Sequence, residues 1–234
     1  MGRDVIIACD FPGREPTLDF LSGFKNEKPF VKIGMELFYS EGPDIVRRIK
    51  DMGHRIFLDL KLCDIPNTVK GGMRSLAGLG ADMLNVHASG GSDMMKAAVD
   101  GLTGPDGKRP ILIAVTVLTS ISEDRLKDEL LVGRGLGETV ARYAELARSS
   151  GLDGVVCSPF EAAGVHNRCG SGFLTVTPGI RFADGDRGDQ ARVATPAAAK
   201  AEGADYIVVG RAVTAAADPV AAYERCVAEF REEG

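Results

Sequence analysis

Short apolar segments alternate with amphipathic segments along the whole 234-residue chain, and this alternation limits the folds that are open to it. Several apolar segments are β-branched and apolar on both faces, which is typical of parallel strands covered by helices. We predict strands at residues 5–10, 30–34, 55–61, 83–87, 111–116, 154–158, 173–177 and 206–210. Amphipathic segments predict helices at 42–52, 68–78, 137–150 and 195–202, with a terminal helix at 218–232.

A weak internal repeat supports the alternation of helix and strand. Gly-x-Asp triplets stand immediately before three predicted strands, at residues 80–82, 151–153 and 203–205. The glycine is a natural end for a helix, because it tolerates positive φ, and the aspartate begins a turn. Eight strand–helix units in one chain of this length predict an α/β fold, a single (β/α)8 TIM barrel domain over residues 1–234. A doubly wound sheet would carry a glycine-rich turn after its first strand, and residues 10–14 do not form one.

Composition narrows the classes of function. The net charge of −5 argues against a nucleic-acid surface, and no apolar segment is long enough to span a membrane. The five cysteines include no Cys-x-x-Cys pair, so we expect reduced thiols in a cytoplasmic protein. The three histidines are scattered, and no metal site is predicted.

Charged residues gather where the first three predicted strands end. Asp59 and Lys61 point to the same side of their strand, and Asp64 follows shortly before Pro66 ends the strand pattern. Asp10 ends the first strand and Lys32 lies in the second. Ligands of (β/α)8 barrels bind at these carboxyl ends, so the charges predict an active site there. Charges held together at a strand end supply a preset field for chemistry.

A second signal concerns the last two strands. The loops after strands seven and eight are the usual phosphate site of this barrel, where backbone N–H groups and a helix start meet the anion. Here they contain Pro178-Gly179-Ile180-Arg181 and Gly210-Arg211. Glycine allows close approach of the backbone, and arginine offers a forked set of donors. The polar segment 181–196 between them has the length and composition of a lid.

The run Asp59-x-Lys61-x-x-Asp64-Ile65-Pro66-Asn67-Thr68 resembles the signature of orotidine 5'-monophosphate decarboxylases of the bacterial type. The similarity extends over nearly the whole chain, and it includes the segments 118–120, 177–181 and 209–211. The resemblance implies decarboxylation of orotidine 5'-monophosphate to UMP and CO2, the last step of de novo pyrimidine biosynthesis, without a cofactor. It also implies a homodimer with shared active sites.

The resemblance further implies a role for each matching residue. Lys61 would stabilise the carbanion at C6 and protonate it, within an alternating network Lys32–Asp59–Lys61–Asp64. Asp64 and Thr68 would reach the ribose in the partner's site. The other implied substrate-binding positions are Asp10 and Lys32 at the ribose, Thr119 and Ser120 at the pyrimidine, Gln190 between pyrimidine and phosphate, and Pro178, Arg181, Gly210 and Arg211 at or near the phosphate.

Two other readings stay open. Mg²⁺-dependent 3-keto-gulonate 6-phosphate decarboxylases and hexulose-phosphate synthases share an Asp-x-Lys-x-x-Asp core on the same barrel. The continuation through Thr68 and the loop with Gln190 favour the pyrimidine nucleotide. A barrel that binds a phosphate ligand without turning it over is the second alternative, although all four positions of the charged network are filled.

Overall fold

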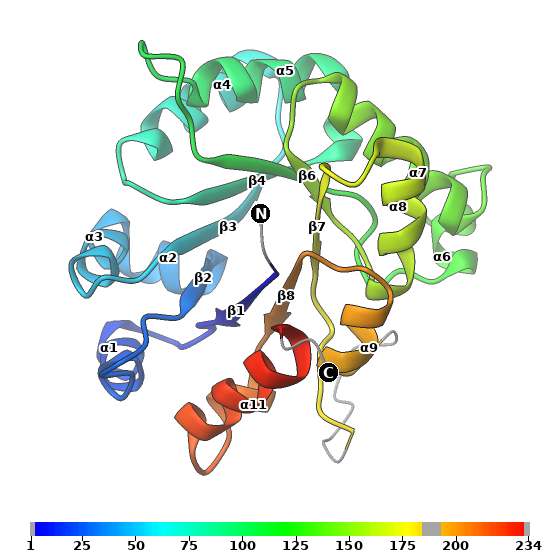
Figure 1. Ribbon diagram of the computed structural model, residues 1–234. Helices are drawn as coiled ribbons and strands as arrows, with labels where there is room; N and C mark the ends of the chain where they lie inside the picture. Colours follow the sequence, from blue (N-terminus) through cyan, green and yellow to red (C-terminus); the bar gives the residue numbers. More distant parts are fainter. Residues whose placement is uncertain (1–2, 184–192, 232–234) are drawn as a thin grey trace.

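The computed structural model describes residues 3–183 and 193–231, and its strands form a closed ring (Figure 1). All neighbouring strands pair in parallel, and β1 closes the ring by pairing with β8. The strands are β1 (Asp4–Ala8), β2 (Phe30–Gly34), β3 (Ile56–Leu62), β4 (Met83–His87), β5 (Ile111–Val115), β6 (Gly154–Val156), β7 (Leu174–Thr177) and β8 (Tyr206–Val209). The predicted (β/α)8 barrel is confirmed, and every strand ends within about two residues of its predicted bounds.

Helices lie around the outside of this ring (Figure 1). They are α1 (Arg14–Ser22), α2 (Met35–Glu41), α3 (Pro43–Asp51), α4 (Pro66–Ala77), α5 (Gly91–Leu102), α6 (Glu123–Asp128), α7 (Leu136–Ser149), α8 (Ala162–Cys169), α9 (Pro196–Ala201), α10 (Arg211–Thr214) and α11 (Pro219–Arg231), with 3₁₀ turns η1 (Ala88–Gly90) and η2 (Pro159–Glu161). The five predicted helices are confirmed. Helix α4 begins at Pro66, two residues before the predicted start, because proline fits the first turn of a helix.

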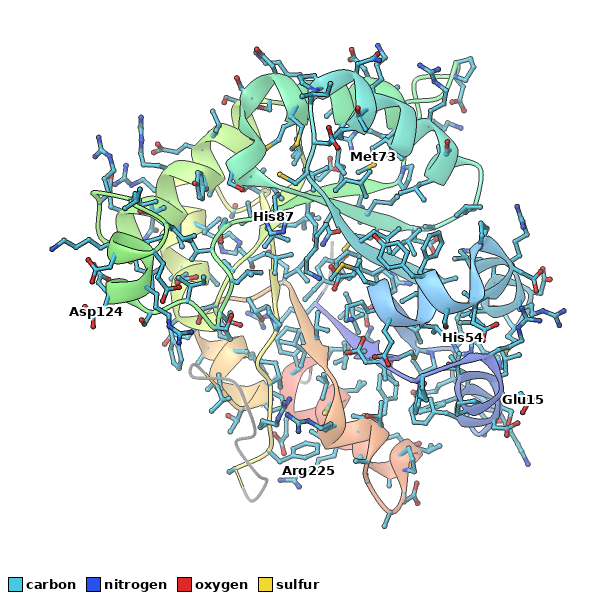
Figure 2. All side chains as sticks on the ribbon, turned by 180° about the vertical axis from the view of Figure 1, so that it is seen from behind. Glu15, His54, Met73, His87, Asp124 and Arg225 are labelled. Atoms are coloured by element: carbon cyan, nitrogen blue, oxygen red, sulfur yellow. The ribbon has the colours of Figure 1, made fainter. Side chains whose placement is uncertain are left out.

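The alternation of side chains along the strands produces two apolar layers. Ile6, Ala8, Phe30 and Phe57 belong to the cluster inside the barrel. The other face of each strand packs against the helices, where Met73 of α4, labelled in Figure 2, is fully buried. Ile6 and Ala8 therefore point inward, and so does Phe57, two residues before Asp59, as the strand parity predicts.

The Gly-x-Asp triplets have a structural role at the other end of the barrel. Gly80, Gly151 and Gly203 have φ of 75°, 89° and 85°, values that favour glycine. Each aspartate accepts a hydrogen bond from a backbone N–H near the start of the preceding strand. The pairs are Asp82 with Ile56 (2.7 Å), Asp153 with Leu112 (2.7 Å) and Asp205 with Thr175 (2.8 Å). The repeat thus ties neighbouring strands together at their amino ends.

Within residues 3–183 and 193–231, no helix is long and apolar enough to cross a membrane.

Candidate active site

A cavity of about 460 Å³ opens at the carboxyl ends of the strands, within the size range of small-molecule sites. Apolar residues of β1, β3, β5, β6, β7 and β8 line it, together with charged and hydrogen-bonding groups. The lining consists of Ala8, Asp10, Lys32, Phe57, Asp59, Lys61, Val115, Val117, Leu118, Thr119, Val156, Cys157, Val176, Pro178, Gly179, Arg181, Val208, Gly210 and Arg211.

Four of the predicted charged residues meet in this cavity. Asp59 accepts a hydrogen bond from the Lys61 ammonium (Oδ1 to Nζ, 2.7 Å), and its Oδ2 lies 3.5 Å from the Lys32 Nζ. The Lys32 ammonium also donates to Asp10 (2.8 Å). The side chains of Lys32 and Asp59 are only 11% and 10% exposed, whereas that of Asp10 is 58% exposed. Anions and cations therefore alternate in the order Asp10, Lys32, Asp59 and Lys61, across the ends of three adjacent strands.

This arrangement keeps the buried pair ionised. Burial alone would raise the pKa of Asp59, but the ammonium groups of Lys32 and Lys61 outweigh it and hold that pKa below its ordinary value. Burial would likewise lower the pKa of Lys32, but Asp59 and Asp10 overcome this effect and raise it. The site thus presents fixed charges in a partly dehydrated place, where their field acts strongly on a bound molecule.

Gly34 provides the space in which this chain of charges packs. A Cβ atom at this position would lie 3.0 Å from the Asp10 Oδ1 and 3.1 Å from the Lys32 Nζ. Both values are shorter than ordinary van der Waals contact. The glycine that follows Lys32 therefore permits the Asp10–Lys32 contact.

Arg181 and Arg211 line the cavity, together with Pro178, Gly179 and Gly210. Gly179 has φ of 84°, and helix α10 begins at Arg211. Beside them, the backbone N–H of Arg181 donates to the Ala194 carbonyl (3.0 Å), and the N–H of Ala194 donates to the Gly179 carbonyl (3.0 Å). These bonds join the two ends of the predicted lid segment next to the cavity. Guanidinium groups and glycine backbone at a barrel mouth suit a phosphate.

Other predicted residues lie elsewhere. Thr119 lines the cavity, but its neighbour Ser120 does not. Asp64 and Thr68 are exposed and do not line it, and the Asp64 Oδ1 accepts from the backbone N–H of Ile65 (2.6 Å). Asp64 therefore does not join the network of its own chain among the described residues. Gln190 lies outside the described residues, as does most of the predicted lid.

Asn85 was not predicted from the sequence. It lies in β4, is 1% exposed, and donates from Nδ2 to the Asp59 Oδ1 (2.6 Å). Its Oδ1 accepts from the backbone N–H of Lys61 (2.8 Å). A polar side chain at an inward position of a mostly apolar strand was the available signal. His87, labelled in Figure 2, has the same parity two residues later, and burial, with the nearby Lys61, lowers its pKa.

Comparison with known proteins agrees with this geometry. The model of the orotidine 5'-phosphate decarboxylase / HUMPS family matches residues 3–226. An orotidine 5'-phosphate decarboxylase of Bacillus cereus is 57% identical over 227 residues, covering 96% of this chain and 95% of that protein.

Solved structures of orotidine 5'-phosphate decarboxylases are also similar to this chain. The orotidine 5'-phosphate decarboxylase of Lactobacillus acidophilus is 46% identical with a TM-score of 0.88, covering 98% of this chain and 100% of that one. The enzyme of the same name from Pyrococcus horikoshii is 27% identical with a TM-score of 0.78 at the same coverage. On its sequence and its fold, the chain belongs to the orotidine 5'-phosphate decarboxylase / HUMPS family.

Proposed function

We propose that this protein is an orotidine 5'-phosphate decarboxylase, which converts orotidine 5'-monophosphate to UMP and CO2 as the last step of de novo pyrimidine biosynthesis. The observation that carries the proposal is the Lys61 ammonium, held 2.7 Å from a buried carboxylate at the wall of a cavity whose rim includes Arg181 and Arg211. The cavity thus pairs a fixed cation, which can also release a proton, with guanidinium groups suited to a phosphate. Membership of the family and the names of its similar relatives support the same activity.

The reaction poses an electrostatic problem. When the bond between C6 and the carboxylate breaks, CO2 leaves and the electron pair stays on C6, in the plane of the ring. Decarboxylases commonly use a cofactor as an electron sink. Here the Lys61 ammonium stabilises the developing charge and then gives its proton to C6, which completes UMP. Asp59 holds the Lys61 ammonium in place, and Lys32 helps to keep Asp59 ionised.

Binding of the remote groups positions C6 against Lys61. Arg211, Arg181, Pro178 and the Gly210 backbone hold the phosphate, and Gln190 bridges it to the pyrimidine. Thr119 binds the pyrimidine edge, with Ser120 next to it, and Asp10 and Lys32 bind the ribose. Contacts far from the reacting bond supply binding energy that supports the chemistry at C6.

The charges in the cavity also favour this activity over the Mg²⁺-dependent alternative. The Asp59 Oδ1 already accepts from Lys61 and Asn85, and its Oδ2 faces Lys32 at 3.5 Å. A divalent cation at this carboxylate would have to approach two ammonium groups, which would repel it.

Turnover tests the function directly. Protein dialysed against EDTA is mixed with orotidine 5'-monophosphate, and UMP is followed by absorbance and chromatography. We expect undiminished turnover in EDTA, and no reaction with 3-keto-gulonate 6-phosphate or hexulose phosphate, with or without Mg²⁺. Absence of UMP at micromolar enzyme, or activity that requires Mg²⁺, would contradict the proposal.

The active form in this proposal is a cytoplasmic homodimer, in which Asp64 and Thr68 complete the partner's site. Both residues are exposed, as contact with a second copy requires, and the apolar Ile65 between them is exposed as well. Mixed Lys61→Ala and Asp64→Ala subunits test this. One of the two sites in such a heterodimer is intact, so we expect activity to return. If subunits exchange and no activity returns, the sites are not shared.

A further inference from the structure

Asn85 occupies an unusual place for an amide. It lies inside the barrel with 1% exposure, between Met83 below and the cavity above, on a strand that is otherwise mostly apolar. A buried amide without hydrogen-bond partners destabilises a fold, because its polar atoms lose their bonds to water. Both ends of this amide have partners, and both partners belong to the charged site.

The first partner is the backbone of Lys61. Strands β3 and β4 pair regularly at Leu58 with Leu84, and pairing resumes at Leu62 with Val86. Three residues of β3 therefore face one residue of β4, which is a β-bulge. Within it, Lys61 has φ of 52°, the left-handed region that a residue with a Cβ rarely occupies. Its N–H donates to the Asn85 side chain instead of to a strand carbonyl (2.8 Å).

The second partner is the Asp59 carboxylate. Because a backbone N–H can only donate, the amide atom that faces Lys61 must be the oxygen, so Nδ2 faces Asp59 and donates to its Oδ1 at 2.6 Å. The same Oδ1 accepts from the Lys61 Nζ at 2.7 Å. Asn85, the Lys61 backbone and the Asp59 carboxylate thus close a ring of three hydrogen bonds, which determines where the ammonium lies.

We propose that Asn85 is a positioning residue of the active site, which holds Lys61 in its left-handed conformation and orients Asp59 toward the ammonium. This inference rests on the proposed function, because it assigns Asn85 to the same reaction. Asn85 does not line the cavity, so its influence on substrate passes through Lys61 and Asp59.

Two variants of Asn85 test whether this residue positions Lys61 and Asp59 or only stabilises the fold. Asn85→Leu keeps a similar volume but removes both hydrogen bonds. We expect its kcat to fall roughly 10–100-fold, as when an outer hydrogen-bond partner of a site is removed, while its affinity for UMP changes less than about threefold. Asn85→Asp keeps the acceptor for the Lys61 N–H but places a second carboxylate against Asp59. Two carboxylates this close favour sharing one proton.

The kcat of the Asn85→Asp variant, relative to that of the wild type, should therefore depend on pH. A protonated Asp at position 85 can donate to Asp59 as the amide does, so the ratio of its kcat to that of the wild type should rise as the pH falls. Other titratable groups lie near the Asp59 carboxylate that Asn85 contacts: Lys32 from β2, Lys61 from β3 and His87 from β4, with Asp10 beyond Lys32. They are present in both proteins, so the ratio removes most of their contribution.

Thr175→Val is the matched control. Thr175 is fully buried on β7 and donates to the Asp205 carboxylate (3.0 Å), but at the other end of the barrel. It should lower stability without changing kcat per UMP-binding site. The inference is overturned if Asn85→Leu keeps kcat within about threefold of wild type, or if Asn85→Asp gives a pH-independent ratio near one. A wild-type protein without turnover would instead overturn the proposed function, and this inference with it.

Discussion

Replacing Lys32 with methionine tests whether the buried charges at the barrel mouth depend on one another. The Lys32 Nζ lies 3.5 Å from the Asp59 Oδ2, and both side chains are about nine-tenths buried. At an effective dielectric constant of about 20, this attraction is about 5 kcal/mol. The substitution also ends the unfavourable burial of an ammonium, so we expect a net loss of about 3 kcal/mol in the free energy of unfolding, the low end for a broken buried pair.

The loss stays at that low end because Asp59 keeps two other donors, the Lys61 Nζ at 2.7 Å and Asn85 at 2.6 Å. In a chain of this length, about 3 kcal/mol lowers the melting temperature by about 6–12 °C. Lys50→Met is the control. Its pair with Asp82 (2.9 Å) is about one-third exposed on both sides, so its loss should stay below about 1 kcal/mol.

The pKa shifts of Asp59 and Lys32 predict how the stability difference between wild type and Lys32→Met depends on pH. The pKa of Asp59 is depressed, so its contribution to stability is present above the unfolded value near 3.9 and disappears as the pH falls through the lower folded value. The pKa of Lys32 is raised, so its contribution is present below the unfolded value near 10.4 and disappears as the pH rises through the folded value. The difference between wild type and Lys32→Met should therefore be greatest between about pH 5 and 9 and shrink at both extremes.

Urea unfolding at a fixed protein concentration, repeated within this range and at both pH extremes, measures the difference. A loss no larger than that of Lys50→Met, or a loss that does not change with pH, would refute the account of a coupled buried network.

Three further substitutions have predicted effects. Gly34→Ala brings a Cβ to 3.0 Å from the Asp10 Oδ1 and 3.1 Å from the Lys32 Nζ. We expect the protein to fold and its kcat/KM to fall roughly tenfold, or about 1.4 kcal/mol. Unchanged kinetics would show that the contact between Asp10 and Lys32 is dispensable. Arg211→Ala should weaken the binding of UMP, measured by calorimetry, by about 2–3 kcal/mol. The binding of uridine, which has no phosphate, should hardly change. Equal losses for both ligands would show that Arg211 does not bind the phosphate. Gly154→Ala would place a Cβ against the backbone of Leu174 in β7, so we expect the free energy of unfolding in urea to fall by about 2 kcal/mol or more. Wild-type stability would contradict this close approach of β6 to β7.

The fold could be predicted because local signals agree along the chain. Each strand is mostly apolar, and three of them follow a Gly-x-Asp triplet whose glycine has positive φ in the structure. The cluster of Asp10, Lys32, Asp59 and Lys61 followed from strand parity and from the rule that ligands bind at the carboxyl ends of barrel strands.

Other features depend on contacts that no local pattern contains. The role of Asn85 requires the shifted register between β3 and β4, and an asparagine in an apolar strand does not reveal such a shift by itself. Asp64 lies only three residues after Lys61 in the signature, yet the chain turns into α4 and leaves its side chain exposed. Ser120 adjoins Thr119 in sequence but does not line the cavity.

The most direct test of the central claim is the turnover of Lys61→Ala on orotidine 5'-monophosphate, compared with wild type and counted per UMP-binding site. Removing the group that both stabilises the carbanion and protonates it should lower kcat by at least about 10⁴-fold. The variant should remain folded and keep most of its affinity for UMP. A kcat near that of the wild type would contradict the account, because the ammonium paired with Asp59 would then not be the proton donor.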